Sequence, residues 1–449
     1  PDPSADRVLI EAVQNSSGMM RIGMINSLAN RKAKDATSLI ASLLKNEDMQ
    51  TAEAAAFALG CIGGEQGVEA VSAALRDAQG SLRLACSQAL LQCADQFAAQ
   101  GQDDKAKEIY TRMYAKESEP VIRARAFGSL LSMTKDLNLM MQALGDADPK
   151  VQGRASQIGV EMPGSKATAR LSALLGKSTP ETRSLLLRVL GDRGDRTALK
   201  KVRRWSQDEN PVVRLAALEA VGKLGDAGCV PLFAKRLASA DVDERNVIRK
   251  SLDGLSGDRV NRAIIRQLPK SKPKAQVELI QSLTVRDATE SASLLLKMTD
   301  SPDRKVRVEA FKALSELGST DDIPALSERV LHCDESDSKE AESALVRLVR
   351  RLGHQSSIGA VLQERFIREQ EAGVRVSLIR LIGAMGDPGS LDTLRDATKD
   401  RDESVRYEAI RALAAWPTSD PIDTLLELAK SADKETHQVI ALRGFIDQI

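Results

Sequence analysis

The stretch PVVRLAALEAVGKLG at Pro211–Gly225 sets the pattern of this chain of 449 residues. The same order of Val-Arg, small residues, Ala, Leu and often Gly returns at Arg304–Gly318, Ala372–Gly386 and Glu403–Trp416. Its arginine recurs at intervals of 31 residues, at Arg183, Arg214 and Arg245 and again from Arg375 to Arg406. A period of this length predicts one small supersecondary unit that is stacked many times.

Each unit is predicted to be a pair of helices, and the segment 211–241 shows the pattern most clearly. Pro211 suits the first turn of a helix, and the preceding Asp-Glu-Asn offers a cap and negative charge there. Small and apolar residues then follow at helical spacing, namely Val213, Ala216, Ala217, Ala220 and Val221. Gly225 should end this first helix after Leu224, and VPLFAKRLA should form the second helix.

The repeat runs through the whole chain, with two irregular places. Residues 1–449 are predicted to form a single all-α, right-handed superhelix of about thirteen helix pairs, the last one only a first helix. A longer pair near 82–118 resembles a tetratricopeptide unit, with Gly101, Ala106 and Tyr110 at fitting positions. The acidic stretch LHCDESDSKEAES at 331–343 is expected to be a longer loop.

The composition limits the classes of function. Hydrophobic residues make up 42% of the chain and aromatic residues only 3%, so Ala, Leu and Val must do most of the packing. A net charge of +1 gives no overall field that would attract nucleic acid or a membrane. No apolar run is long enough to span a membrane. The chain starts without Met or a signal peptide, and we expect it to be a piece of a longer protein.

The five cysteines are predicted to be buried free thiols. Their odd number and the absence of a C-x-x-C motif argue against a disulfide framework and against a zinc knuckle.

The repeat pattern, written D-x-x-x-x-V-R-x-x-A-x-x-A-L-x-x-L-G, resembles HEAT repeats, in particular the short bacterial type. The resemblance covers nearly the whole chain and implies an α-solenoid of the HEAT or armadillo kind. That family serves as scaffolds, adaptors and a few enzymes. The C-terminal stretch 414–449 resembles the end of HEAT arrays in large exported bacterial proteins that also carry a keto-disaccharide-hydrolase-type or haem-binding domain. This second likeness rests on Trp416-Pro417, Pro421, His437 and Ala441–Gly444, and it favours an exported or periplasmic protein, with a cytoplasmic one as the alternative.

The recurring arginines invite a ligand-binding interpretation, but a structural one is favoured. Most of them follow an acidic residue by a few positions, as Arg214 follows Asp208, and Asp303 and Asp402 precede others. In HEAT-like stacks such side chains form a ladder between neighbouring units. We therefore expect a ladder at Arg123, Arg183, Arg214, Arg307, Arg375 and Arg406, with anion binding as the alternative.

One segment of the chain is strongly basic. Residues 181–280 hold 21 Lys and Arg against 13 Asp and Glu, with dense groups at LKKVRRW (Leu199–Trp205) and PKSKPK (Pro269–Lys274). LKKVRRW should be a second helix on the concave face, with Ala198, Val202 and Trp205 buried. The predicted partner-binding residues are Lys200, Lys201, Arg203, Arg204 and Arg236. A solvated face is the usual explanation for such a charged segment. The alternative is contact with an acidic protein, a polyanionic glycan or nucleic acid.

No motif in the chain predicts catalysis, a cofactor or a metal site. His332, Cys333 and His354 match no common ligand spacing, and no phosphate-binding or nucleophile motif occurs in a strand–turn–helix setting. A HEAT-type nucleic-acid protein would need a basic groove with exposed aromatic rings, and Trp205 and Trp416 both fall on apolar stripes. A HEAT-like bilin lyase is another enzyme alternative, but no motif supports it.

The sequence therefore predicts a non-catalytic scaffold that binds a protein, or a domain of its own parent chain, along its concave surface. The alternatives are an accessory module of an exported carbohydrate-processing enzyme and a nucleic-acid-binding protein. We expect a protein partner rather than nucleic acid, and no membrane span.

Overall fold

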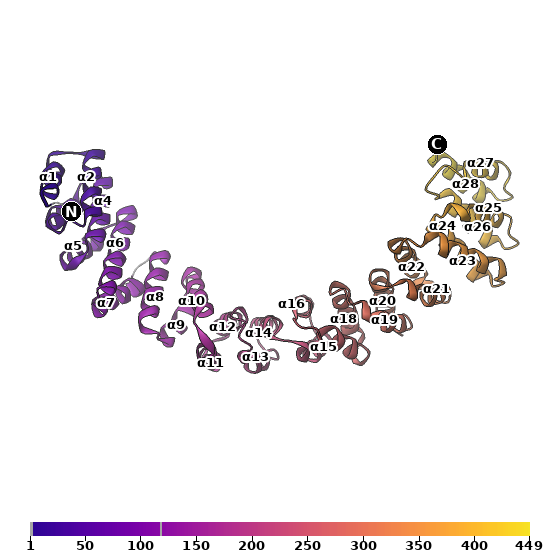
Figure 1. Cartoon of the computed structure of the whole chain (residues 1–449), viewed down its shortest axis with the longest axis horizontal. Coiled ribbons are helices and arrows are strands. Elements are labelled where there is room, and N and C mark those ends of the chain that lie inside the picture. Colours follow the sequence, from indigo (N-terminus) through magenta and orange to yellow (C-terminus); the bar gives the residue numbers. More distant parts are fainter. Residues whose placement is uncertain (1–2, 117–118) are drawn as a thin grey trace. The chain divides into compact units, whose positions relative to one another are not determined.

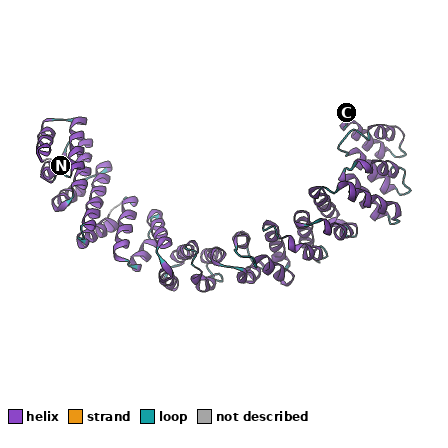
Figure 2. Ribbon diagram, viewed as in Figure 1, coloured by secondary structure: helices purple, strands orange, loops and turns teal. Residues whose placement is uncertain are grey.

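The computed structural model describes residues 3–116 and 119–449, and every regular element in this part of the chain is a helix (Figures 1 and 2). The predicted all-α class is confirmed. The chain divides into two compact units, Pro1–Leu224 and Gly225–Ile449. None of the described helices combines the length and apolar character needed to cross a membrane.

The first unit holds helices α1 to α14. Their bounds are α1 Pro3–Asn15, α2 Gly18–Arg31, α3 Thr37–Ser42, α4 Met49–Ile62, α5 Gly64–Asp77, α6 Gly80–Ala99, α7 Asp103–Lys116, α8 Pro120–Thr134, α9 Leu137–Leu144, α10 Pro149–Glu161, α11 Gly164–Leu174, α12 Pro180–Asp192, α13 Leu199–Trp205 and α14 Pro211–Leu224.

The second unit holds helices α15 to α28. Their bounds are α15 Val230–Leu237, α16 Val242–Gly254, α17 Val260–Gln267, α18 Pro273–Val285, α19 Ala292–Met298, α20 Arg304–Leu317, α21 Ile323–Leu331, α22 Ser338–Leu352, α23 Gln355–Arg368, α24 Ala372–Met385, α25 Leu391–Ala397, α26 Glu403–Ala414, α27 Ile422–Ser431 and α28 Glu435–Asp447.

Helix α14 forms as the sequence predicts. Asn210 caps it, because its Oδ1 accepts hydrogen bonds from the amides of Val212 and Val213 at 2.9 and 3.3 Å. The five predicted core positions of this helix are all buried. The helix ends at Leu224, directly before Gly225.

The helices of each unit form two layers. The even-numbered helices, which carry the Val-Arg pattern, contact one another in succession and make a first-helix layer. The odd-numbered helices from α3 onward make a second-helix layer. Within each unit taken alone, Figure 1 shows the first-helix layer on the inner side of the curve and the second-helix layer on its outer side. The prediction that second helices such as LKKVRRW line the concave face is therefore wrong.

Close packing of small residues explains this arrangement of layers. A Cβ added to Gly191 of α12 would lie 3.0 Å from Cα of Ala220 in α14. A Cβ added to Gly444 of α28 would lie 2.6 Å from Cα of Ala414 in α26. First helices approach so closely only because these side chains are small, and the layer with the closer spacing lies inside the curve.

The first of the two irregular places in the repeat, near residues 82–118, is a longer pair of helices. The long pair consists of α6, with 20 residues, and α7, and Ala106 and Tyr110 are buried between them. Gly101 adopts a φ of 74° in the turn, where glycine is favoured. The likeness to a tetratricopeptide unit stays a prediction, and residues 117–118 lie outside the described part.

The predicted acidic loop at 331–343 is wrong. Helix α21 ends at Leu331, a 3₁₀ turn covers Glu335–Asp337, and α22 begins at Ser338. The acidic residues fold into a helix start because Asp337 is fully buried there between two arginines.

Candidate protein-binding surfaces

The predicted arginine ladder between neighbouring repeats is confirmed at Arg123, Arg183, Arg307 and Arg375, whose ion-pair partners Asp146, Asp208, Asp337 and Asp400 belong to the following repeat. Arg214 and Arg406 donate to carbonyl oxygens of the loop before their own helix.

Arg183 of α12 donates hydrogen bonds to the carbonyl oxygens of Leu175 and Ser178 at 2.8 and 2.7 Å. Its guanidinium lies 4.2 Å from the ring centre of Trp205, and its Nη1 is 3.9 Å from Oδ2 of Asp208. Arg183 therefore joins its own loop to the following repeat through stacking and charge.

Arg375 repeats this arrangement in the second unit. Its guanidinium lies 4.2 Å from the ring centre of Phe366, and Nη1 donates to the carbonyl oxygens of Phe366 and Glu369 at 2.9 and 3.0 Å. It also forms an ion pair with Asp400, whose side chain is only 8% exposed. These arginines are occupied by the fold, which disfavours the alternative that the ladder binds an anionic ligand.

The acid that completes these rungs comes from the next repeat, as expected for a ladder between neighbouring units. Asp208 pairs with Arg183 through its carboxylate, while its carbonyl oxygen accepts a hydrogen bond of 2.8 Å from Arg214. Asp400 serves Arg375 and Arg406 in the same two ways. The upstream acids Asp303 and Asp402 instead cap helices through backbone amides.

Many charges of the first-helix layer are likewise paired across repeats. In the first unit, Lys223 of α14 lies 2.6 Å from Asp192 of α12. In the second unit, Arg245 and Arg249 of α16 both lie 3.6 Å from the carboxylate of Glu278 in α18. Charges in this layer therefore contribute to stacking as well as to solubility.

The second-helix layer of the first unit contains a surface of a different kind. Helix α11, the turn after it and helix α13 carry seven exposed basic residues, and the segment that begins α13 contacts α11. None of the seven has an ion-pair or hydrogen-bond partner for its side chain among the described residues. We call this set the basic surface, and it consists of Lys166, Arg170, Lys177, Lys200, Lys201, Arg203 and Arg204.

Acidic residues are missing from the two segments that form the basic surface. Residues 162–177 and 196–207 contain no Asp or Glu. The acid just before the second segment is Asp195, which caps the 3₁₀ turn Arg196–Ala198. Hydrogen bonds, chiefly from the Thr197 hydroxyl, lower the pKa of Asp195 to about 2, so its carboxylate is ionised and occupied. The positive charge of the basic surface therefore remains uncompensated.

The structure places four of the five predicted partner-binding residues on the basic surface. Lys200, Lys201, Arg203 and Arg204 are exposed on α13, while Ala198 and Val202 are buried as predicted and Trp205 is half-buried.

Arg236 differs from the other four, because it belongs to α15 of the second unit. Its Nη2 lies 2.5 Å from Oε1 of Glu244, a buried carboxylate at the start of α16. An arginine that satisfies a buried acid is committed to the fold.

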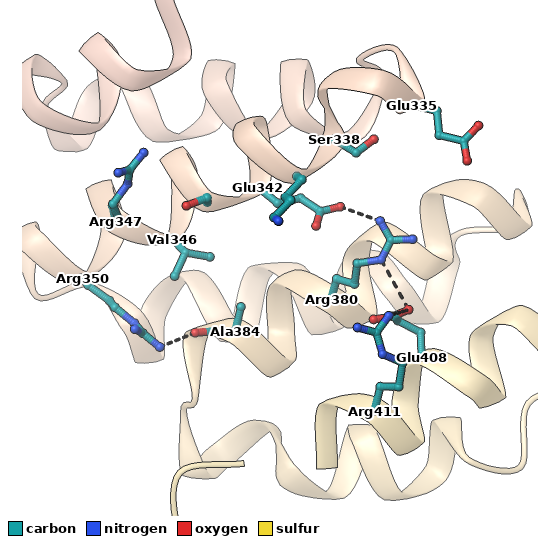
Figure 3. A pocket seen from close by; sticks show the side chains of 12 residues that line it. Glu335, Ser338, Glu342, Val346, Arg347, Arg350, Arg380, Ala384, Glu408 and Arg411 are labelled. Carbon is teal, nitrogen blue, oxygen red and sulfur yellow. Dashed lines mark hydrogen bonds and ion pairs between the residues drawn. The ribbon is translucent and has the colours of Figure 1, made fainter. Parts of the chain in front are cut away.

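A groove crosses three first helices of the second unit. It has a volume of about 790 Å³ and lies between α22, α24 and α26 (Figure 3). Eight of its twelve lining residues are charged. Its lining consists of Glu335, Ser338, Lys339, Glu342, Ser343, Val346, Arg347, Arg350, Arg380, Ala384, Glu408 and Arg411.

Arg380 occupies the middle of a relay of ion pairs at one end of the groove. Its Nη1 lies 3.1 Å from Oε1 of Glu342, and its Nε lies 3.5 Å from Oε2 of Glu408. Arg411 approaches the same Oε2 at 3.3 Å. Burial raises the pKa of Glu342, and the charge of Arg380 opposes that shift. Figure 3 shows Arg347 and Arg350 at the opposite end.

The cysteines and histidines have ordinary structural environments. All five cysteines are free thiols; Cys86, Cys93 and Cys229 are buried as predicted, whereas Cys61 and Cys333 are half-buried. His332 lies 3.7 Å from Glu328, and His354 contacts the hydroxyl of Thr320. Within residues 3–116 and 119–449, no three His, Cys, Asp or Glu side chains gather as a metal-binding group.

Sequence reasoning missed two parts of these surfaces. The basic residues of α11 lie outside the segment 181–280, whose net positive charge is evident from the sequence. The absence of Asp and Glu from residues 162–177 would have indicated that the basic surface extends onto α11. The groove had no such signal, because its charged residues are spread over 77 positions of sequence, from Glu335 to Arg411, and meet only through stacking.

A sequence profile described as HEAT repeats matches residues 7–91, 167–253, 261–346 and 359–443, which together cover most of the chain. No curated protein matches the sequence.

Similar solved structures include three karyopherin structures. Kap95p, from a complex with RanGDP, has 13% identity and a TM-score of 0.42, over 99% of this chain and 71% of that one. Yeast importin-β (Kap95p) has 12% identity and a TM-score of 0.37, over 96% and 70%. Kap121p bound to the extreme C-terminus of the phosphatase Cdc14p has 12% identity and a TM-score of 0.45, over 99% of this chain and 57% of that one.

Proposed function

Because the chain belongs to the HEAT-repeat family, we propose that it is a non-catalytic scaffold whose basic surface binds a protein partner or another domain of its parent chain. HEAT repeats usually offer extended surfaces for protein binding. The observation that carries the proposal is the contrast between the basic surface and the paired charges of the ladder and of the first helices. Many ladder and first-helix charges are paired across repeats, whereas the seven cations of α11, the turn after it and α13 lack acidic partners among the described residues.

The chemistry of the basic surface favours an acidic protein. Uncompensated cations attract a carboxylate-rich surface, raise the association rate and disfavour basic competitors. A nucleic-acid partner would also be attracted, but single-stranded nucleic acid favours exposed aromatic rings for base stacking. Trp205, the one aromatic ring in these segments, is half-buried and covered by Arg183.

Charge reversal with a matched control tests the proposal. The variant Lys201→Glu/Arg204→Glu removes two cations of the basic surface and breaks no side-chain contact in the described structure. Lys45→Glu/Arg76→Glu is the control, because both residues are exposed in the second-helix layer of the same unit and the charge change is equal. The full chain is used as bait in extract of the native host.

The proposal expects specific proteins that the wild type and the control variant retain and the basic-surface variant loses. Equal retention by all three forms would refute the role of the basic surface. Binding of duplex DNA with a steep salt dependence, lost in the same variant, would favour the nucleic-acid alternative instead.

Two further proposals concern the organisation of the chain and the compartment in which the protein works. We propose that the units form one continuous array over residues 1–449, as the unbroken repeat predicts. An exported accessory role beside a carbohydrate-processing domain rests on the likeness at 414–449. Trp416 and His437, which carry part of that likeness, are both buried and so also serve packing. Fractionation of the native host would test export, because recovery in the cytoplasm alone would contradict it.

A further inference from the structure

We propose that the groove between α22, α24 and α26 is a separate binding site for a linear peptide segment rich in carboxylates. This site differs from the basic surface in three respects. It lies in the second unit, it belongs to the first-helix layer, and it is a groove rather than a flat face. Its volume of about 790 Å³ lies within the range of ligand-binding clefts.

The distribution of charge along the groove favours an acidic occupant. Five lining residues are cations and three are acids. Two of the acids, Glu342 and Glu408, are already held by Arg380 in the relay. The relay also uses Arg380 and Arg411, so outside it the lining offers Lys339, Arg347 and Arg350 to an acidic segment and Glu335 alone to a basic one.

The cationic end of the groove is prepared for this occupant. Arg347 is exposed and has no ion-pair or hydrogen-bond partner among the described residues. Lys339, at the start of α22 and so away from this end, is likewise exposed and unpaired among them. Arg350 donates one hydrogen bond from Nη2 to the carbonyl oxygen of Ala384, which fixes its guanidinium and leaves its other donors open. Arginine binds carboxylates through paired donors, and prior fixing of the side chain reduces the entropy lost on binding.

The shape and lining of the site favour a peptide over a compact ligand or nucleic acid. The groove crosses three helices and adjoins a second cavity of about 270 Å³ that shares Arg350, Arg380 and Arg411 with it. Small-molecule sites are mostly lined by apolar side chains, and this lining is mostly charged. It also contains no aromatic ring on which a base could stack.

Binding of two labelled peptides to the full chain tests the proposal. The probe is a fluorescein-labelled peptide of about twelve residues in which Glu alternates with Leu and Ala, and the reference peptide has Gln in place of Glu. Fluorescence polarisation is measured at low and high salt. The groove variant is Lys339→Glu/Arg347→Glu, which breaks no described contact. The control is Arg262→Glu/Lys305→Glu, at two exposed cations of the same unit outside the groove.

The expected result is saturable binding of the Glu peptide that weakens with salt and falls at least about tenfold for the Gln peptide and for the groove variant. The control variant should stay within about twofold. Equal binding of both peptides, equal loss in both variants, or no saturation up to about 1 mM peptide would overturn the proposal.

Two further outcomes would also overturn it. Loss of peptide binding in Lys201→Glu/Arg204→Glu, with the groove variant unchanged, would place the peptide on the basic surface. Displacement of the peptide by duplex DNA, with DNA binding abolished in the groove variant, would assign the groove to phosphate. Failure of the groove assay leaves the scaffold proposal standing, because that proposal rests on residues of the other unit.

Discussion

Replacement of Asp337 by Asn should loosen the stack between α20 and α22. The Asp337 carboxylate is fully buried, and its Oδ2 accepts from Nε of Arg307 at 2.5 Å. Its Oδ1 lies 3.0 Å from Nε of Arg304. Asn keeps the size of the side chain and removes its charge, so the change isolates the two charge-assisted contacts.

The loss of stability in Asp337→Asn depends on the contacts that Arg304 and Arg307 keep in the variant. Removing one partner of a buried ion pair costs about 3–5 kcal/mol. Arg304 is half exposed and can be hydrated again. Arg307 keeps Asp334 at 3.0 Å and a hydrogen bond of 3.0 Å to the carbonyl oxygen of Ser301. The loss should therefore be about 2 kcal/mol, or roughly a thirtyfold rise in the local opening constant.

Hydrogen exchange measures the loss of stability separately for each helix. A local measurement is needed because a repeat protein need not unfold in a single step. Core amides of α20 and α22 should exchange about thirtyfold faster in Asp337→Asn, while amides of the first unit stay unchanged. Glu65→Gln is the control, because Glu65 and its partner Lys105 are both exposed, and it should change exchange by less than about twofold. An effect at Asp337 no larger than the control would refute the idea that buried rungs hold the repeats together.

Three other outcomes follow from the packing. Gly444→Ala should destabilise the contact of α28 with α26 by about 1–3 kcal/mol, because the new Cβ would meet Ala414. Gly153→Ala places its Cβ in open space within α10 and should stabilise the protein by up to about 1 kcal/mol, and thermal melts of the two variants test both effects. Burial raises the pKa of Cys93 to about 12, so iodoacetamide at pH 8 should modify this thiol only after denaturation, as read by mass spectrometry. Burial, with a smaller contribution from a nearby arginine, lowers the pKa of His437 below its usual 6.5, so the unfolded chain takes up this proton first as the pH falls. Once corrected for intrinsic exchange rates, the protection of α28 amides should therefore be constant above pH 6.5 and should decline between pH 6.5 and the pKa of His437 in the folded chain. The variant His437→Gln should show a weaker dependence on pH.

Local features of the fold could be predicted from the sequence because they depend on short-range rules. Helix α14, its cap and its buried positions follow from helical spacing and from one Asn. The arginine ladder was predictable in kind, because the same residue returns at the same place in each repeat. Its acidic partners were predictable only in part: Asp208 pairs with Arg183 of the preceding repeat, as a ladder between neighbouring units requires, whereas Asp303 and Asp402 cap helices and Asp400 pairs with Arg375.

Features that depend on stacking could not be read from the sequence. The acidic run at 331–343 has the composition of a loop, and only the presence of Arg304 and Arg307 beside Asp337 turns it into a helix start. The side on which LKKVRRW lies depends on the relative spacing of two helix layers. The basic residues of α13 were identifiable from charge density, but their continuation onto α11 and the groove around Arg380 required the packed structure.

The central claim is that the basic surface contacts a protein, and site-specific photo-crosslinking tests it most directly. A photoreactive amino acid replaces Lys201 in one form of the full chain and Lys45 in another, both within native host extract. The account predicts a covalent protein adduct from position 201 only, with the crosslinked partner peptide rich in Asp and Glu. The same adducts from both positions, or adducts to nucleic acid alone at position 201, would contradict it.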